Sequence, residues 1–237
     1  MSDFDTVEQL LPNITLTAVI VANGVPVVGL LAFNMSGLGL VVFYWIEFTI
    51  LSLWALLRGL FAGMPPEPDD EQPAFGTTYR LTDWGNAGIS IPETDVKILY
   101  RTLPGLVFLI PFLGALWVGF GGFVAGPVIT ANPEAELPVW VIVGAATVVI
   151  TEGWRTGIEY FYRGGYRQTT VWIALRGVLL EGFVLVVAGL LVLTFANELA
   201  DSRTINIETA ARRPLILAAI IIKFSIDLAR YHLERHD

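Results

Sequence analysis

Long apolar blocks separated by short polar segments dominate the pattern along this chain. Six blocks each have the length of about 18 or more residues that an α-helix needs to cross the hydrocarbon core of a bilayer. They lack the strict apolar and polar alternation of a half-buried strand. We therefore predict an all-α fold, a polytopic bundle of six transmembrane helices in one membrane domain over residues 1–237. The predicted spans are residues 14–33, 38–61, 103–128, 137–161, 171–195 and 214–231.

Residues 62–101 form the one long connection between predicted spans. Its first part, MPPEPDDEQP, is rich in proline and acidic residues, which is typical of disordered segments. The remainder contains enough Tyr, Trp and Ile to lie on the membrane surface or to cap the bundle. We expect a loop that is partly disordered.

The distribution of basic residues predicts the orientation of the bundle. Six spans place both termini on one side, together with the segments that follow the second and fourth spans. Most basic residues fall on that side, and only Arg203, Arg212 and Arg213 fall on the other. Because Lys and Arg are enriched in cytoplasmic loops, we expect a multi-pass protein of the cell membrane with both termini and the 62–101 loop in the cytoplasm.

The overall composition excludes several classes of function. Apolar residues make up 54% of the chain and charged residues only 15%, whereas a soluble domain is about a quarter charged. The chain has no cysteine, and both histidines, His232 and His236, lie in the C-terminal tail, so thiolate sites and an intramembrane haem held by histidine are excluded. We expect no cofactor and no metal. Nucleic-acid binding is not expected, because there is no basic run beyond the pair Arg212 and Arg213.

The excess of acidic over basic residues indicates a protein from a salt-rich habitat. Acidic residues number 22 against 14 basic ones, and only Lys97 and Lys223 are lysines. Acidic loops stay solvated in concentrated salt, which screens charge over only about 3 Å. This composition predicts a halophilic protein and says nothing of its chemistry.

Several polar side chains are predicted to lie inside the membrane. An ionisable side chain that faces hydrocarbon costs at least about 2.5 kcal/mol, so Glu47, Glu181, Lys223 and Asp227 should point inward, pair or meet water. At about 1.5 Å per residue, Glu47, Glu181 and Lys223 lie near the bilayer centre, and Asn23 lies at a similar depth. We predict an intramembrane polar cluster. It is either a proton or cation pathway or an ion-pair network that fixes the packing of the helices.

Glu152 and Arg155 form a second polar group, near the cytoplasmic end of the fourth span. Their spacing, with Glu159 one turn further on, allows pairing along one helical face. A charge near the end of a span can snorkel to the interface at little energetic cost. The two residues are expected to anchor the helix at the interface, or to form a gate or a contact with lipid head groups.

The third predicted span is rich in glycine. Its segment GFVAG places Gly122 and Gly126 in the small-xxx-small pattern that lets helices approach closely. This pattern fits packing within the chain, and it also fits a contact with a second copy or with a membrane-complex partner. The lipid bilayer is the other expected partner.

Catalytic motifs offer no support for a common enzyme class. The sequence has no phosphate-binding glycine loop ending in GKS or GKT, no HExxH, no GxSxG, and no DxxD or DxxxD pair within a span. The leading hypothesis is a small transporter or channel-like protein with a midplane acidic site. The alternatives are a non-catalytic membrane scaffold or subunit, and a membrane-embedded lipid-modifying enzyme.

Two short segments carry a resemblance to a known family. NGVPVVG in the first span contains Asn23 and Pro26, and FYWIE in the second contains Tyr44, Trp45 and Glu47. With this NxxP and YWxE pattern the chain resembles a family of multi-pass membrane proteins from haloarchaea, a domain of unknown function. The resemblance implies a membrane location and marks these five positions, and it implies no activity.

Overall fold

The computed structural model describes residues 37–64, 87–92, 94, 96–130, 133–134 and 136–200. Four helices in these ranges are long and apolar enough to cross a membrane: Leu38–Leu60, Thr102–Thr130, Val139–Tyr162 and Val171–Leu191. They coincide with the second to fifth predicted spans to within a few residues. The predicted first and sixth spans lie outside the described residues, and so do Asn23, Lys223 and Asp227.

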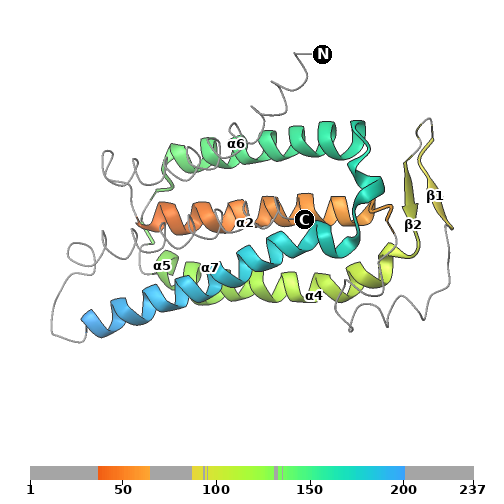
Figure 1. Cartoon of the computed structure of the whole chain (residues 1–237). Coiled ribbons are helices and arrows are strands. Elements are labelled where there is room, and N and C mark those ends of the chain that lie inside the picture. Colours follow the sequence, from red (N-terminus) through yellow and green to blue (C-terminus); the bar gives the residue numbers. More distant parts are fainter. Residues whose placement is uncertain are drawn as a thin grey trace, which may run out of the picture.

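Helix α2 (Gly37–Leu60) lies between α6 (Val139–Arg155) on one side and both α4 (Thr102–Phe120) and α7 (Val171–Ala200) on the other (Figure 1). Contacts along the helices fix their directions. Phe43 and Trp54 of α2 pack on Gly144 and Gly153 of α6, so these two helices run parallel.

The direction of α7 is opposite to that of α2. Phe48 packs on Gly182, and Gly59, further along α2, packs on Leu175, which comes earlier in α7. Gly59 also contacts Leu106 near the start of α4, so α4 runs opposite to α2 as well. The four helices therefore alternate in direction along the chain, as consecutive crossings of a membrane would.

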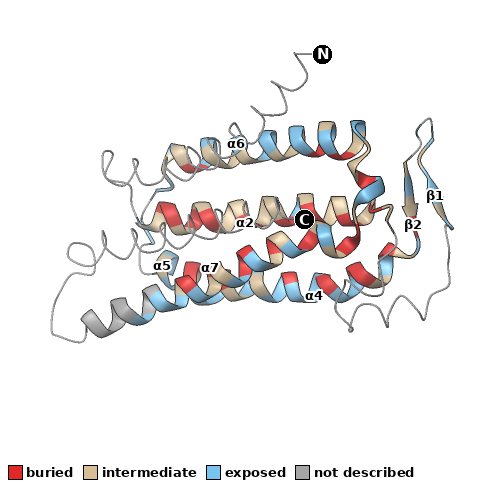
Figure 2. Ribbon diagram, in the orientation of Figure 1, coloured by how far each residue is buried: buried red, intermediate tan, exposed pale blue. Residues whose placement is uncertain are grey.

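The core lies where α2, α4 and α7 meet. Phe48 and Leu175 are fully buried there, and a Cβ added to Gly182 would lie 2.6 Å from Cε2 of Phe48. By contrast α6 buries only Val141, and its outer face is exposed and apolar, with Val139 at 74% exposure (Figure 2). Such a face suits contact with lipid, because a membrane helix gains nothing by hiding apolar side chains from hydrocarbon.

The membrane-length helix Thr102–Thr130 contains a π-helical turn, η1 (Gly121–Ala125), followed by α5 (Gly126–Thr130). Pro127 accounts for this change, because proline has no N–H and its ring would clash with the carbonyl four residues earlier in an α-helix. The N–H of Gly126 instead bonds to the carbonyl of Gly121. Gly121 also allows close approach, since a Cβ there would lie 2.7 Å from the ring of Trp45.

The predicted small-residue pair, Gly122 and Gly126, makes no close contact with another described helix. A Cβ at Gly122 would meet nothing within 4 Å, and one at Gly126 would lie 3.0 Å from the carbonyl oxygen of Gly121 in the same helix. The close packing on α2 is therefore made by Gly121, whereas Gly122 in η1 faces none of the other described helices.

The connections at one end of the bundle contain small elements that the all-α expectation did not include. Strand β1 (Gly88–Ser90) pairs antiparallel with β2 (Lys97–Leu99), with Ile89 opposite Ile98. A π-helical turn, η2 (Thr156–Tyr162), and a 3-10 turn, η3 (Gly165–Gln168), join α6 to α7.

Candidate functional site

Every lysine and arginine of the described ranges lies toward the end of the bundle where α2 ends and where α4 and α7 begin. They are Arg58, Lys97, Arg101, Arg155, Arg163, Arg167 and Arg176. The connection at the opposite end, between α5 and α6, carries Glu134 and Glu136. Among the described residues, the basic side chains are therefore confined to one end of the bundle, whereas acidic side chains occur at both.

A chain of ion pairs joins α2 to α6 at the basic end. Nη2 of Arg58 lies 3.4 Å from Oε2 of Glu152, and Oε1 of Glu152 lies 3.8 Å from Nη1 of Arg155. Nε of Arg155 in turn donates a hydrogen bond of 3.4 Å to Oε2 of Glu159. The pairing expected along α6 is thus present, and Arg58 adds a partner from another helix.

Glu152 is the carboxylate most enclosed by this network. Its side chain and that of Arg58 are each 17% exposed, and its Oε2 atom accepts no hydrogen bond from the part of the chain that the structure describes. The interaction between Glu152 and Arg58 is therefore an ion pair without a hydrogen bond. Two guanidinium groups next to one enclosed carboxylate compensate much of the energy needed to remove it from water.

Hydrogen bonds hold the surrounding backbone in place. The hydroxyl of Tyr160 in η2 donates to the carbonyl of Arg58, and Arg101 donates to the carbonyl of Gly63. The N–H of Gly63 donates to the carbonyl of Tyr166 at 2.7 Å. The end of α2 is thus tied to the start of α4 and to the segment that leads into α7.

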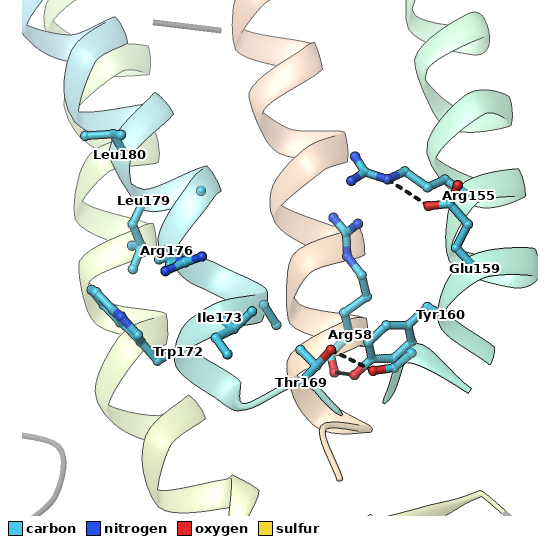
Figure 3. A pocket seen from close by; sticks show the side chains of 13 residues that line it. Arg58, Arg155, Glu159, Tyr160, Thr169, Trp172, Ile173, Arg176, Leu179 and Leu180 are labelled. Carbon is cyan, nitrogen blue, oxygen red and sulfur yellow. Dashed lines mark hydrogen bonds and ion pairs between the residues drawn. The ribbon is translucent and has the colours of Figure 1, made fainter. Parts of the chain in front are cut away.

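A pocket of about 730 Å³ lies beside the ion pairs, between the end of α2, η2 and the first turns of α7 (Figure 3). Ligand sites for small molecules have volumes of about 300–1,000 Å³, so this pocket can hold a molecule of that size. Arg58, Arg155 and Arg176 line it from three different helices. We call it the arginine pocket.

The arginine pocket has a polar side and an apolar side. Glu159, Tyr160 and Thr169 complete the polar side, and Thr169 also donates to the carbonyl of Gly165 at 2.8 Å. The apolar side is a wall on α7, formed by Trp172, Ile173, Leu179 and Leu180. The pocket therefore combines guanidinium groups, which in proteins bind carboxylate and phosphate oxygens in a bidentate manner, with an apolar surface.

The two described members of the predicted midplane cluster lie on neighbouring helices. Glu47 on α2 is half-buried, and Glu181 on α7 is buried with 7% exposure. The contact between Phe48 and Gly182, the residues that follow them, places both at the same level of the bundle. Neither carboxylate lines the arginine pocket. The described residues contain no group of three or more His, Cys, Asp or Glu side chains that could hold a metal ion.

Sequence reasoning missed Arg58 and Arg176 as residues of this pocket. Both are arginines about one turn from the end of an apolar block, which is a usual position for interfacial anchors. What sets them apart is that the packing of α2, α6 and α7 brings them to the same pocket as Arg155. No local pattern carries that information.

These features define the class of the protein as helical with a membrane location. They are the apolar helices of membrane-spanning length, the exposed apolar face of α6 and the basic end of the bundle. The chain belongs to a family of unknown function (DUF6498), whose sequence model matches residues 6–237. This confirms the expected membership of a family of unknown function. Comparisons with curated proteins and with solved structures gave no match.

Proposed function

We propose that this chain is a six-span protein of the cell membrane that binds an anionic amphiphile in the arginine pocket. The observation that carries the proposal is the convergence of Arg58, Arg155 and Arg176 on one pocket that also has an apolar wall. An anionic head group would contact the guanidinium groups, and the apolar part of the ligand would lie along Trp172 and its neighbours on α7.

The position of the pocket supports an amphiphilic ligand. It lies near the end of three apolar helices, where a membrane passes from hydrocarbon to head groups. The basic residues gather at the same end, which supports a cytoplasmic location for the pocket and for both termini. A lipid or another anionic amphiphile could reach this site from the bilayer.

Single substitutions of the pocket arginines test the proposal. A hydrogen bond to a charged group contributes about 1.5–3 kcal/mol, so Arg58→Gln, Arg155→Gln and Arg176→Gln should each weaken binding of an anionic phospholipid roughly 10- to 100-fold. Arg163→Gln is the matched control, because Arg163 is exposed at the same end and does not line the pocket. Native mass spectrometry of the purified protein with added lipid measures the bound fraction. Equal binding by all four variants would refute the proposal, and chemical conversion of the bound lipid would assign a lipid-modifying enzyme.

Glu47 and Glu181 lie at the same level of the bundle on neighbouring helices, and this favours a second candidate function. That function is a proton or cation pathway through the midplane. A buried carboxylate inside a bundle is a functional hypothesis by default, because placing its charge there is unfavourable. Glu47→Gln and Glu181→Gln in proteoliposomes should each abolish flux of the proton or cation. A loss of stability with unchanged flux would show that the two carboxylates only orient the helices.

A further inference from the structure

The β1–β2 hairpin has two chemically different faces. The N–H of Ile91 donates to the carbonyl of Val96 at 3.1 Å, and the N–H of Tyr100 donates to the carbonyl of Ala87 at 3.0 Å. These bonds extend the pairing of the strands by one residue at each end. Because side chains alternate between the two faces of a strand, one face is entirely apolar. Its members are Ala87, Ile89, Ile91, Val96, Ile98 and Tyr100, and we call it the apolar face of the hairpin.

This apolar face is exposed. Ile89 is 57% exposed and Tyr100 is exposed as well, while the opposite face carries the polar side chains of Ser90 and Lys97. In a water-soluble antiparallel sheet the apolar face packs on the core and the polar face meets water. Here the buried residue, Leu99, belongs to the polar face. The apolar face is therefore directed away from the side on which the hairpin is buried.

Tyr100 connects the apolar face to an exposed stripe of α4. Its carbonyl accepts the N–H of Leu103 at 3.2 Å, and Tyr100, Leu103 and Val107 follow the i, i+3 and i+7 spacing of one helical face. All three side chains are exposed, that of Val107 to 70%. The stripe continues along the membrane-length helix Thr102–Thr130, where exposed apolar side chains suit contact with lipid. The apolar face of the hairpin is thus continuous with a surface suited to hydrocarbon.

The hairpin also lies at the level where a bilayer passes from hydrocarbon to head groups. It stands beyond the end of α2 and next to the start of α4, with its strands running across the direction of the helices (Figure 1). Arg101 donates to the carbonyl of Gly63, which ties the base of the hairpin to the end of α2. Tyrosine is enriched at this level of a membrane, and lysine is attracted to anionic head groups. Tyr100 on one face and Lys97 on the other give the hairpin the composition of an interfacial segment.

We propose that the apolar face of the hairpin lies in the head-group region of the bilayer at the basic end of the bundle. It anchors the connection between α2 and α4 to the lipid surface. Amphipathic segments that lie in this region bury their apolar side chains about 5–10 Å into the boundary between head groups and acyl chains. The anchor is independent of the proposed function, because no residue of the hairpin lines the arginine pocket.

Site-specific fluorescence tests this contact. Because the chain has no cysteine, an environment-sensitive fluorophore can be attached to one introduced thiol at a time. The full chain is reconstituted in lipid nanodiscs with the fluorophore at Ile89→Cys or Ile98→Cys, both on the apolar face. Ser90→Cys is the matched control, because Ser90 is exposed, follows Ile89 directly and belongs to the opposite face. Lipids with a nitroxide near the head-group end of the acyl chain quench a fluorophore that touches them.

We expect a blue-shifted emission and a loss of fluorescence to the nitroxide lipid at Ile89→Cys and Ile98→Cys. Ser90→Cys should give the emission of a fluorophore in water, with little quenching. A nitroxide near the methyl end of the acyl chain should quench the two apolar positions less, because the contact is shallow. Unchanged helical content in circular dichroism shows that each labelled variant is folded.

Three results would overturn the proposal. Emission as in water at Ile89→Cys and Ile98→Cys would place the apolar face in water. A blue-shifted emission without quenching by either lipid would show that a second copy or another part of the chain covers it. Equal quenching at Ser90→Cys would show that the hairpin has no lipid-facing side.

Discussion

Substitution of Glu152 by glutamine removes two ion pairs at once, one to Arg58 on α2 and one to Arg155 on its own helix. Substitution of Arg58 by glutamine removes only the first and leaves Glu152 with the 3.8 Å contact to Arg155. Comparison of the two single variants with the double variant therefore isolates the contact that joins α2 to α6. Through its two ion pairs, Glu152 contacts two of the three arginines of the pocket.

The burial of the pair sets the expected magnitude. Breaking a fully buried ion pair lowers the free energy of unfolding by about 3–5 kcal/mol, and breaking an exposed one by about 0–1 kcal/mol. With both side chains 17% exposed, this pair lies between the two limits. We expect about 1–3 kcal/mol for each single substitution and a coupling energy of about 1–2 kcal/mol in the double-mutant cycle.

Thermal unfolding of the detergent-solubilised variants measures these values. For a chain of this size 1 kcal/mol corresponds to a shift in Tm of about 2–4 °C, so each single variant should melt roughly 2–12 °C below the wild type. Arg163→Gln should stay within about 0.5 kcal/mol, because surface substitutions away from such contacts usually do. Strictly additive effects of the Arg58 and Glu152 substitutions would show that the two side chains do not interact.

Other substitutions test the packing and the orientation of the bundle. Gly182→Leu should destabilise the bundle by about 1–3 kcal/mol in the same melting assay, because even a Cβ atom at this position would crowd the ring of Phe48. Gly122→Leu should leave the Tm of the monomer unchanged, because a Cβ at Gly122 would contact none of the described residues. A lower oligomeric mass of Gly122→Leu in light scattering would show that this open face contacts a partner, and an unchanged mass would contradict that contact. Thr49→Val should lower the free energy of unfolding by about 1 kcal/mol, because it removes the 2.7 Å hydrogen bond from Nε1 of Trp117, and an unchanged Tm would contradict this. Since the chain has no cysteine, Glu134→Cys introduces a single thiol. A membrane-impermeant maleimide added to intact cells should label this thiol, because the orientation proposed here places residue 134 outside the cell. Absence of labelling would show that the bundle has the opposite orientation.

The helices of the described ranges were predictable because their apolar blocks are long and continuous. In a membrane, a block of more than 20 apolar residues can form few structures other than a helix. The starts of α2 and α7 follow directly on polar segments. The β1–β2 hairpin was not predictable in the same way. Its strands have three residues each, too short for an alternating pattern to stand out.

The site was predictable only where its contacts are local. Glu152 and Arg155 are three residues apart on one helix, so their pairing follows from helical geometry. Arg58 belongs to a different helix, and its contact with Glu152 depends on how α2 packs against α6. The glycine pattern alone could not identify Gly121 as the residue that packs on α2, because Gly121 and Gly122 differ only in the direction that each faces in η1.

Photo-crosslinking with an anionic phospholipid tests most directly whether the arginine pocket is a ligand site. A phospholipid with a photoreactive group next to its phosphodiester, followed by peptide mapping, should label the wall of the pocket at Ile173, Leu179 and Leu180. Excess unlabelled phosphatidylglycerol should compete with this labelling, and excess zwitterionic lipid should not. The exposed outer face of α6, with Ile142 and Val143, is the internal reference for contact with bulk lipid. Labelling that is equal on the two surfaces and insensitive to the competitor would contradict the proposed binding site.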